Sequence, residues 1–234
     1  MSRVLITGAS RGIGHALAAE LLRQGTEVIG TSRYPQCIKI EDPSFTAIEL
    51  DLAQITEDRA VLDSLVDQCK DVDGLVLNAG VGRFGGLEEF SHSQIERLIS
   101  INLVAQIQIV RAFIPIFKRR GSGDIIFIGS ESALTAGKQG TIYSAAKFGL
   151  RGFSQALRRE CANNNIRVGL INPGMVNSHF FDELGFQPGP DKTNSISPGQ
   201  VAGAVMMMLN SADNVVFDEI NLSPLKKVIV KKKP

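Results

Sequence analysis

The chain has 234 residues, of which 44% are hydrophobic and 21% charged, and its formal net charge at pH 7 is +1. This length and composition suit a single α/β domain, and the near-neutral charge excludes the strongly basic character of a nucleic-acid-binding protein. No charged and apolar leader precedes Val4, and no apolar run approaches the roughly 18 residues of a transmembrane helix. We therefore expect a soluble chain with no nucleic-acid or membrane partner.

The cysteines indicate the redox environment of the chain. Cys37, Cys69 and Cys161 show no C-x-x-C spacing and leave one cysteine unpaired. This usage favours a reducing cytoplasm over a disulfide scaffold. We expect all three to be small buried side chains rather than nucleophiles, and we assign no metal site.

A strand expected over residues 3–7 runs directly into a glycine-rich turn, and a helical pattern follows over residues 15–24. This order predicts a phosphate site, because glycines let a pyrophosphate approach the backbone N–H groups at the positive end of a helix. The spacing is G-x-x-x-G-x-G rather than the commoner G-x-G-x-x-G. The residues of this turn that we assign to a cofactor are Gly8, Ser10, Arg11, Gly12, Ile13 and Gly14.

A second strand over residues 27–31 ends at Ser32 and Arg33. Dinucleotide folds usually place an acid here to hold the ribose 2′-OH, and this chain has none in reach. Arg33 together with Arg11 suits a ribose 2′-phosphate, because a guanidinium binds phosphate through two hydrogen bonds. The pattern predicts NADP(H) rather than NAD(H); two unrelated surface arginines are the alternative.

The rest of the chain continues to alternate between strand and helix patterns. Residues 34–44 contain two prolines and no helical stripe, so the crossover helix there should be short or missing. The further expected elements are strands over 45–50, 72–77, 124–128 and 167–171, helices over 57–70, 91–120, 143–163 and 197–209, and edge strands over 215–217 and 228–230. This alternation predicts one domain, residues 1–234, built on a doubly wound, Rossmann-like parallel sheet.

Polar or glycine-containing turns follow several of these strands. These turns hold Asp51 and Leu52, then Asn78, Ala79 and Gly80, then Ser130, and finally Pro173, Gly174, Val176 and Ser178. In open α/β sheets, ligands bind at the carboxyl ends of the strands, which makes the turn of Asn78 to Gly80 a candidate binding site.

Tyr143 and Lys147 are four residues apart, which places them on one face of a helix. An ammonium beside a phenol favours the phenolate and brings a pKa of about 10 towards working pH, as acid-base catalysis requires. An amphipathic pair on a solvated face is the alternative for this motif alone. Asn102, inside the long helix, is by itself most simply a hydrogen-bonded polar neighbour.

Residues 178–200 form a long segment that carries Phe180, Phe181, Leu184 and Phe186 among many Gly, Pro, Ser and Asn residues. Such a segment at the carboxyl edge of a sheet suggests a lid over a substrate pocket, and a disordered insertion is the alternative. With residues 81–84 and 131–139 it would line a pocket for a mainly apolar molecule. The lysine-rich end, Lys226 to Lys233, should be a solvated tail or the fringe of a last strand.

Taken together and in this order, the motifs from the glycine turn to Ser178 resemble the short-chain dehydrogenase/reductase family, over nearly the whole chain to about residue 210. The resemblance implies that Ser130 orients a substrate carbonyl or alcohol oxygen and that Tyr143 gives or takes the proton. It implies that Lys147 holds the nicotinamide ribose and lowers the phenol pKa, and that Asn102 anchors a water on the proton path. Ser132 is a nearby rival for the serine role.

The same resemblance implies contacts to the cofactor from the strand ends. Asp51 and Leu52 are similar to the family's adenine contacts, Asn78 to Gly80 to its turn beside the cofactor, and Pro173 to Ser178 to its cover over the nicotinamide. The C-terminal part, residues 218–234, departs from the family's glycine-rich ending and speaks against a tetramer. A homodimer through the helices of Asn102 and Tyr143 remains open.

The leading hypothesis is an NADP(H)-dependent oxidoreductase acting on a small carbonyl or alcohol substrate in the cytoplasm. A non-catalytic NADP(H)-binding regulator on the same fold is the alternative, and the presence of both Tyr143 and Lys147 argues against it. An epimerase or dehydratase is a third interpretation, which the short chain disfavours. The sequence does not choose among ketone, aldehyde, sterol, sugar or pterin.

Overall fold

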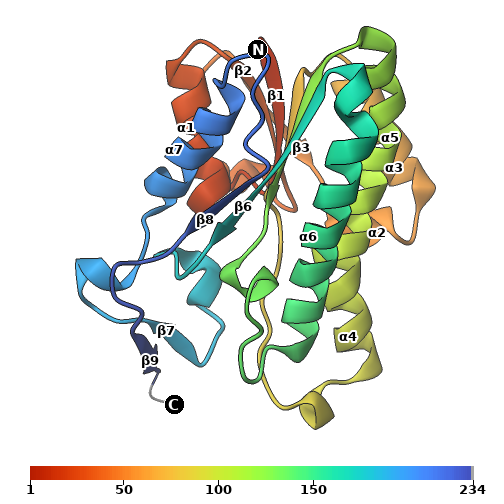
Figure 1. Ribbon diagram of the computed structural model, residues 1–234. Coiled ribbons are helices and arrows are strands. Elements are labelled where there is room, and N and C mark those ends of the chain that lie inside the picture. The colour runs from red at the N-terminus through yellow and green to blue at the C-terminus, as the bar shows by residue number, and fades with distance from the viewer. Residues whose placement is uncertain (233–234) are drawn as a thin grey trace.

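A computed structural model describes residues 1–232 (Figure 1); Lys233, at the end of the expected lysine-rich tail, lies outside them. The strands are β1 (Arg3–Thr7), β2 (Glu27–Ser32), β3 (Phe45–Glu49), β4 (Gly74–Leu77), β5 (Gly123–Ile128), β6 (Ile166–Pro173), β7 (Phe186–Pro188), β8 (Glu219–Leu222) and β9 (Ile229–Lys231). Seven of them form one sheet in the order β3-β2-β1-β4-β5-β6-β8, with every neighbouring pair parallel. The predicted doubly wound, Rossmann-like fold is confirmed.

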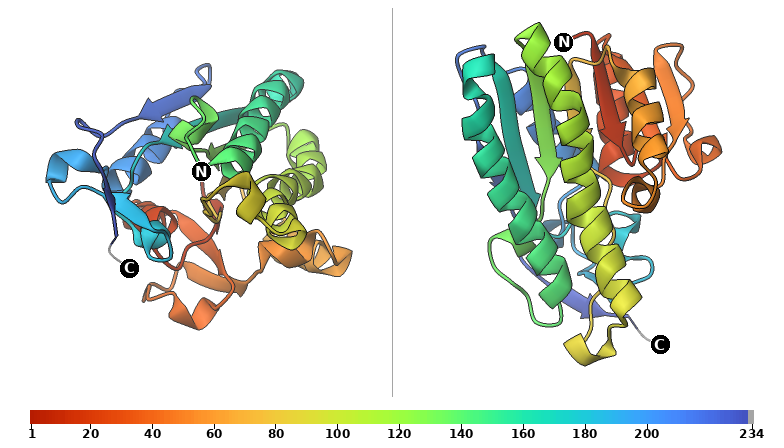
Figure 2. Two further views of the ribbon diagram at one scale, coloured as in Figure 1. Left: turned by 90° about the horizontal axis from the view of Figure 1, so that it is seen from below. Right: turned by 90° about the vertical axis from the view of Figure 1, so that its right-hand side faces the viewer.

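The helices cover both faces of this sheet (Figure 2). They are α1 (Gly12–Arg23), α2 (Leu52–Ile55), α3 (Arg59–Cys69), α4 (His92–Ile99), α5 (Ala105–Arg120), α6 (Thr141–Cys161) and α7 (Pro198–Leu209). One buried cluster joins α1 and α7 to the sheet, and a larger one joins α2, α3, α5 and α6 to the other face. Phe113, Phe117 and Phe127 are wholly enclosed in the larger cluster.

The strand order reverses between β1 and β4, so the connections after these two strands diverge to opposite faces. Ligands in such sheets bind at the carboxyl ends of the strands, beside this reversal. The turns after β1 and β4 are the glycine-rich turn and the turn of Asn78. The topology therefore brings the two motifs to neighbouring strand ends.

The helix expected over residues 91–120 is present but not uniform. Residues Ser100–Val104, between α4 and α5, form a π-helical turn, in which the backbone hydrogen bonds span five residues instead of four. By length and hydropathy, the continuous helix His92–Arg120 could cross a membrane, contrary to our expectation that no apolar run approaches that length. Of its apolar window, 39% is buried, and the buried side chains, including Phe113 and Phe117, pack against the sheet.

The last strand of the main sheet is not where we expected an edge strand. Residues 215–217 form no strand, and β8 begins at Glu219. Asp218 and Glu219 make the sequence here look unlike a buried strand. In the structure both acids have partners on α6, because Arg151 pairs with Glu219 at 2.9 Å and Arg158 with Asp218 at 3.0 Å. The other expected edge strand corresponds to β9, which pairs with β7 outside the main sheet.

The connection after β2 has no crossover helix, as predicted. A single short 3-10 turn, Pro35–Cys37, takes its place. Because this turn packs little against the sheet, Cys37 is exposed, and our expectation of a buried residue was wrong there. Cys69 and Cys161 are buried, as expected.

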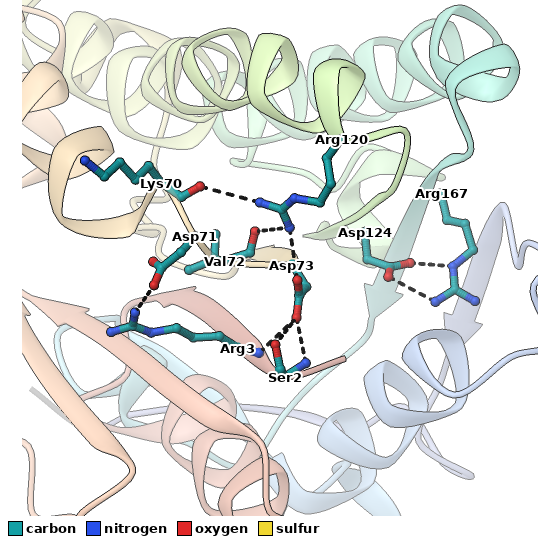
Figure 3. Close-up of polar contacts among 9 residues, drawn as sticks. All are labelled: Ser2, Arg3, Lys70, Asp71, Val72, Asp73, Arg120, Asp124 and Arg167. Carbon is teal, nitrogen blue, oxygen red and sulfur yellow. Dashed lines mark hydrogen bonds and ion pairs between the residues drawn. The ribbon is translucent and has the colours of Figure 1, made fainter.

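A polar network closes the opposite edge of the sheet, where the strands begin (Figure 3). One carboxylate oxygen of Asp73 accepts hydrogen bonds from the backbone N–H and hydroxyl of Ser2, both 2.6 Å, and from the N–H of Arg3 at 3.1 Å. Its other oxygen accepts from Arg120 at 3.0 Å. Burial acts to raise the pKa of Asp73, but these hydrogen bonds and the charge of Arg120 outweigh it and hold the pKa below the usual 3.8.

We expect Asp73→Asn to lower the free energy of unfolding at pH 7 by about 1–2 kcal/mol, because it removes a charged acceptor of several hydrogen bonds. The folded-state pKa lies below the unfolded value, so this stabilisation is complete above 3.8 and is lost as pH falls through the folded pKa. Urea denaturation at pH 7 and pH 3 should show the difference between wild type and variant shrinking at pH 3. The exposed Asp63→Asn serves as control, and a difference independent of pH would contradict the role given to Asp73.

Candidate active site

The glycine turn between β1 and α1 is shaped by close backbone approach. Gly8 and Gly12 have φ of +73° and +61°, and a Cβ on Gly14 would lie 2.2 Å from the carbonyl oxygen of Gly8. Helix α1 begins without a capping side chain and without an acid in its first turn, whereas Ser91 and Ser197 cap α4 and α7. The first N–H groups of α1 are therefore left for an anion, which fits a dinucleotide phosphate.

The turn after β4 is bonded to this glycine turn. The Asn78 side-chain amide donates to the carbonyl oxygens of Thr7 and Gly8, at 2.9 and 3.0 Å. The Thr7 hydroxyl accepts from the N–H groups of Asn78 and Ala79, each at 3.0 Å. Asn78 thus holds the two strand ends in register, a structural role that leaves Ala79 and Gly80 at the site's edge.

The ends of β2 and β3 lie beside the same turn. The N–H of Ala9 donates to Thr31 and that of Leu50 to Ser32, each at 2.9 Å. Ser32 is buried, whereas Arg11 and Arg33 are exposed. Within the described part of the chain, neither guanidinium pairs with an acid, so both are available to a ligand.

Asp51 and Leu52, at the end of β3, have local structural roles. Asp51 caps α2, its carboxylate accepting from the N–H of Ala53 at 3.0 Å. Leu52 is buried in the larger core cluster. These contacts leave the adenine role of both residues as a prediction.

Tyr143 and Lys147 lie on the buried face of α6, with exposed fractions of 7% and 3%. The alternative of a solvated surface pair is therefore excluded. The Lys147 ammonium donates to the carbonyl oxygen of Ile128, at the end of β5, at 2.9 Å, and lies 5.8 Å from the centre of the Tyr143 ring. Ser130, two residues beyond Ile128, is close enough to the phenol for its side chain to lower the pKa of Tyr143. The end of β5 and the start of α6 thus bring all three polar groups together.

Burial controls the protonation of this pair. It raises the pKa of Tyr143 to about 12; the Ser130 side chain acts to lower it and the charge of Glu131 to raise it. Burial also lowers the pKa of Lys147 to about 8. We expected the ammonium to bring the phenol pKa down, but desolvation has the larger effect. With a pKa of about 12, the phenol is protonated at neutral pH.

Asn102 lies in the π-helical turn and is fully buried. Its side chain exchanges two hydrogen bonds with the backbone of Val81, at 2.9 and 3.1 Å, and donates to Leu98 at 3.0 Å. A Cβ on Gly80 would lie 2.7 Å from Asn102 Oδ1 and 3.8 Å from Lys147 Nζ. Asn102 and Lys147 therefore both approach the turn after β4 at Gly80.

Asn172 is a site residue that we did not single out from the sequence. Fully buried before Pro173, it accepts from the N–H of Ser130 at 3.3 Å and donates to Glu219 and Asn221 at 2.9 and 3.0 Å. It thereby links the Ser130 turn to β8. Its place at a strand end, directly before Pro-Gly, was the available signal.

The segment from Pro173 to Ser178 crosses from β6 to the glycine turn. The N–H of Gly174 donates to Leu222 at 2.7 Å, and Val176 is buried and bridges to Ile196. A Cβ on Gly12 would lie 3.5 Å from the Cβ of Ser178. The last of the candidate cofactor residues therefore lie at the same edge as the first.

Residues 178–200 fold over the Tyr143 ring. The ring centres of Phe84 and Phe180 lie 5.3 and 6.0 Å from that of Tyr143, and Phe186 lies 5.1 Å from Phe84. A small apolar cluster, comprising Met175, Phe180, Phe181, Leu184 and Phe186 with Phe84, holds the segment in place. The alternative of a disordered insertion is wrong.

The end of the chain is fastened to this segment (Figure 1). β9 pairs antiparallel with β7, the Lys232 ammonium donates to the carbonyl oxygens of Phe181 and Asp182, and Lys227 pairs with Glu131 at 2.8 Å. We refer to residues 224–232 as the C-terminal segment. Its lysines make specific contacts rather than forming only a solvated tail.

Comparison with known proteins agrees with this arrangement. The model of the family described as short chain dehydrogenase matches residues 2–188. The chain belongs to the short-chain dehydrogenase family. Short-chain dehydrogenases are oxidoreductases, which makes the cluster around Tyr143 the candidate active site.

Individual members of the family show the extent of the likeness. The uncharacterized oxidoreductase YbbO of Escherichia coli strain K12 is 35% identical over 185 residues, covering 77% of this chain and 68% of that protein. An alcohol dehydrogenase from Thermococcus sibiricus complexed with 5-hydroxy-NADP superposes with a TM-score of 0.83 at 26% identity, covering 97% of this chain and 99% of that one. A metagenomic short-chain oxidoreductase in complex with NADP gives 0.81 at 28% identity, covering 97% and 98%.

Deleting the C-terminal segment from Lys226 onward should release residues 178–200, because it removes β9 and the contacts of Lys227 and Lys232. We expect chymotrypsin to cleave after Phe180 or Phe181 about tenfold faster or more, since protection falls when local unfolding becomes easier. The main sheet should unfold cooperatively as before. Lys226→Ala, which keeps the backbone contact to Thr193, is the control. An unchanged cleavage rate in the shortened chain would refute the idea that the C-terminal segment holds residues 178–200 in place.

Proposed function

We propose that this chain is an NADP(H)-dependent oxidoreductase that transfers hydride between nicotinamide and a carbonyl or alcohol substrate, with Tyr143 as general acid and base. The observation that carries the proposal is the cluster of buried Tyr143, Lys147 and Asn102 with half-buried Ser130, at the sheet edge that also holds the glycine turn. Two of the family's solved structures are complexes with NADP or a derivative of it. Residues 178–200 act as the lid of the substrate site.

The glycine turn and the uncapped start of α1 would bind the pyrophosphate, and Arg11, Ser32 and Arg33 the ribose 2′-phosphate. Asp51 and Leu52 would contact the adenine, and Pro173 to Ser178 would cover the nicotinamide. When bound, the nicotinamide supplies or accepts the hydride, whereas the chain provides placement and protons.

In carbonyl reduction, the Tyr143 hydroxyl donates its proton to the substrate oxygen, which Ser130 orients by a hydrogen bond. A pKa of about 12 keeps that proton available at neutral pH. Lys147 stabilises the phenolate that remains, because its ammonium lies beside the same ring and is held there by Ile128. Asn102 shapes the path by which the phenolate regains a proton from solvent.

Tyr143→Phe should reduce turnover of a carbonyl substrate by about 10²–10⁴-fold, the usual contribution of a positioned acid or base. NADPH affinity, measured by fluorescence titration, should stay within about twofold, because the ring and its packing remain. The exposed Tyr34→Phe is the matched control and should change neither value. Wild-type turnover in Tyr143→Phe would refute the acid-base role, and cofactor binding without turnover of any carbonyl by the wild type would favour a regulator.

The arginines test cofactor choice. Replacing Arg11 and Arg33 with alanine should lower the ratio of kcat/KM for NADPH to that for NADH by about ten- to a hundredfold, since each guanidinium loses charge-assisted hydrogen bonds to phosphate. Steady-state kinetics with both cofactors measures this ratio. Arg59→Ala, an exposed arginine on α3, should leave it unchanged. Equal or better wild-type turnover with NADH would contradict the NADP(H) preference.

We also propose a homodimer built on α4, α5 and α6, and a cytoplasmic location. Phe148, on the outer side of α6, is 42% exposed, and an isologous pairing of long helices would bury it. The three cysteines of the described residues are all free, as in a reducing compartment.

A further inference from the structure

Several aromatic rings surround Tyr143. The rings of Phe84 and Phe180 lie within 6.0 Å of the phenol ring, and the rings of Phe181 and Phe186 extend this wall. A substrate bound at Tyr143 would lie close to these rings. Edge and face contacts between aromatic groups are favourable at these distances, so the wall favours an aryl or other bulky apolar substituent beside the carbonyl.

One carboxylate interrupts this apolar environment. Glu131 directly follows Ser130, and its Oε2 would lie 3.3 Å from a Cβ placed on Gly174. Its charge also reaches the phenol, whose pKa it raises. Glu131 therefore lies between the residue proposed to orient the substrate and the segment proposed to cover the cofactor.

The partner of this carboxylate comes from the far end of the chain. Lys227 Nζ lies 2.8 Å from Glu131 Oε2, with exposed side-chain fractions of 55% and 27%. The C-terminal segment holds Lys227 there through backbone bonds on both sides: Lys226 N–H to Thr193, and Gly189 N–H to Val228, each at 2.9 Å. The ion pair is thus built from two distant parts of the sequence.

We propose that Glu131 and Lys227 determine charge specificity at this site: as a pair they present no net charge to the substrate, and the site takes uncharged aryl or bulky apolar carbonyl compounds in preference to carboxylated ones. This inference rests on the proposed reductase function. The aromatic rings favour an aryl or bulky apolar substituent on the substrate, and the ion pair favours a substrate without charge.

The physical reason is desolvation. A carboxylated substrate would carry its charge among aromatic rings and close to Glu131, and the neighbouring cations are already engaged, Lys147 with Ile128 and Lys227 with Glu131. A charge moved out of water without a partner is strongly disfavoured, whereas an uncharged aryl group gains from the transfer. Removing either member of the pair unmasks the charge of the other.

The test uses three aldehydes with one ring: benzaldehyde, 4-carboxybenzaldehyde and 4-(trimethylammonio)benzaldehyde. With NADPH, the wild type should show a kcat/KM for benzaldehyde at least about tenfold above that for the carboxylated analogue. Glu131→Gln leaves Lys227 without its carboxylate partner. It should raise the ratio of kcat/KM for the carboxylated aldehyde to that for benzaldehyde by about fivefold or more. Lys227→Gln leaves the charge of Glu131 unpaired. It should lower that ratio and raise the ratio of kcat/KM for the trimethylammonio aldehyde to that for benzaldehyde.

Opposite shifts in these two variants distinguish a role in charge selection from a structural role, which would lower all three rates together. Lys226→Gln, an exposed neighbour in the same segment, is the matched control and should leave every ratio within about twofold. Equal use of the three aldehydes by the wild type, or shifts of the same sign in both variants, would overturn the inference. Reduction of other carbonyl compounds but of none of these aldehydes would overturn it and leave the proposed function standing, whereas no reduction of any carbonyl would overturn both.

Discussion

The contact on which the site depends is that of the buried face of α6 with the end of β5. The hydrogen bond from Lys147 to Ile128 anchors the helix at the strand end from which Ser130 follows. Lys147 is 3% exposed, so an ammonium is kept in an apolar interior with a backbone carbonyl as its protein partner. Burying an ammonium costs free energy unless it is paired and hydrogen-bonded. Here the hydrogen bond to Ile128 also holds Lys147 close to Tyr143 and Ser130.

Other parts of the structure support this contact by joining strand ends. Asn78 binds the glycine turn to the turn after β4, Asn102 binds that second turn to the central helix, and Asn172 joins the Ser130 turn to β8. Each asparagine satisfies backbone groups that irregular segments would otherwise leave unpaired. The turns at the carboxyl edge of the sheet are consequently joined to one another by hydrogen bonds.

Residues 178–200 and the C-terminal segment form a second layer on this edge. They contribute rings to the surroundings of Tyr143 and the lysine that pairs with Glu131, and they belong to no strand of the main sheet. Variation here can change the substrate without disturbing the sheet, because binding residues on connecting segments are supported by a separate core. Residues 224–232, which lie in the part of the chain that departs from the family's usual ending, thus belong to this second layer.

The sequence alone determined the doubly wound sheet, the glycine turn and the Tyr143–Lys147 spacing, because these follow from local periodicity and from motifs a few residues long. Tertiary structure alone decided what depends on distant partners. It allowed β8 to begin at an acid, Glu219, directly after another, Asp218, because arginines on α6 pair with both. It also joined Asn172 to Ser130 and brought Lys227 to Glu131. It also decided the direction of the Tyr143 pKa shift, because desolvation depends on how completely residues distant in the sequence enclose the phenol, and the spacing of residues along the chain does not contain that information.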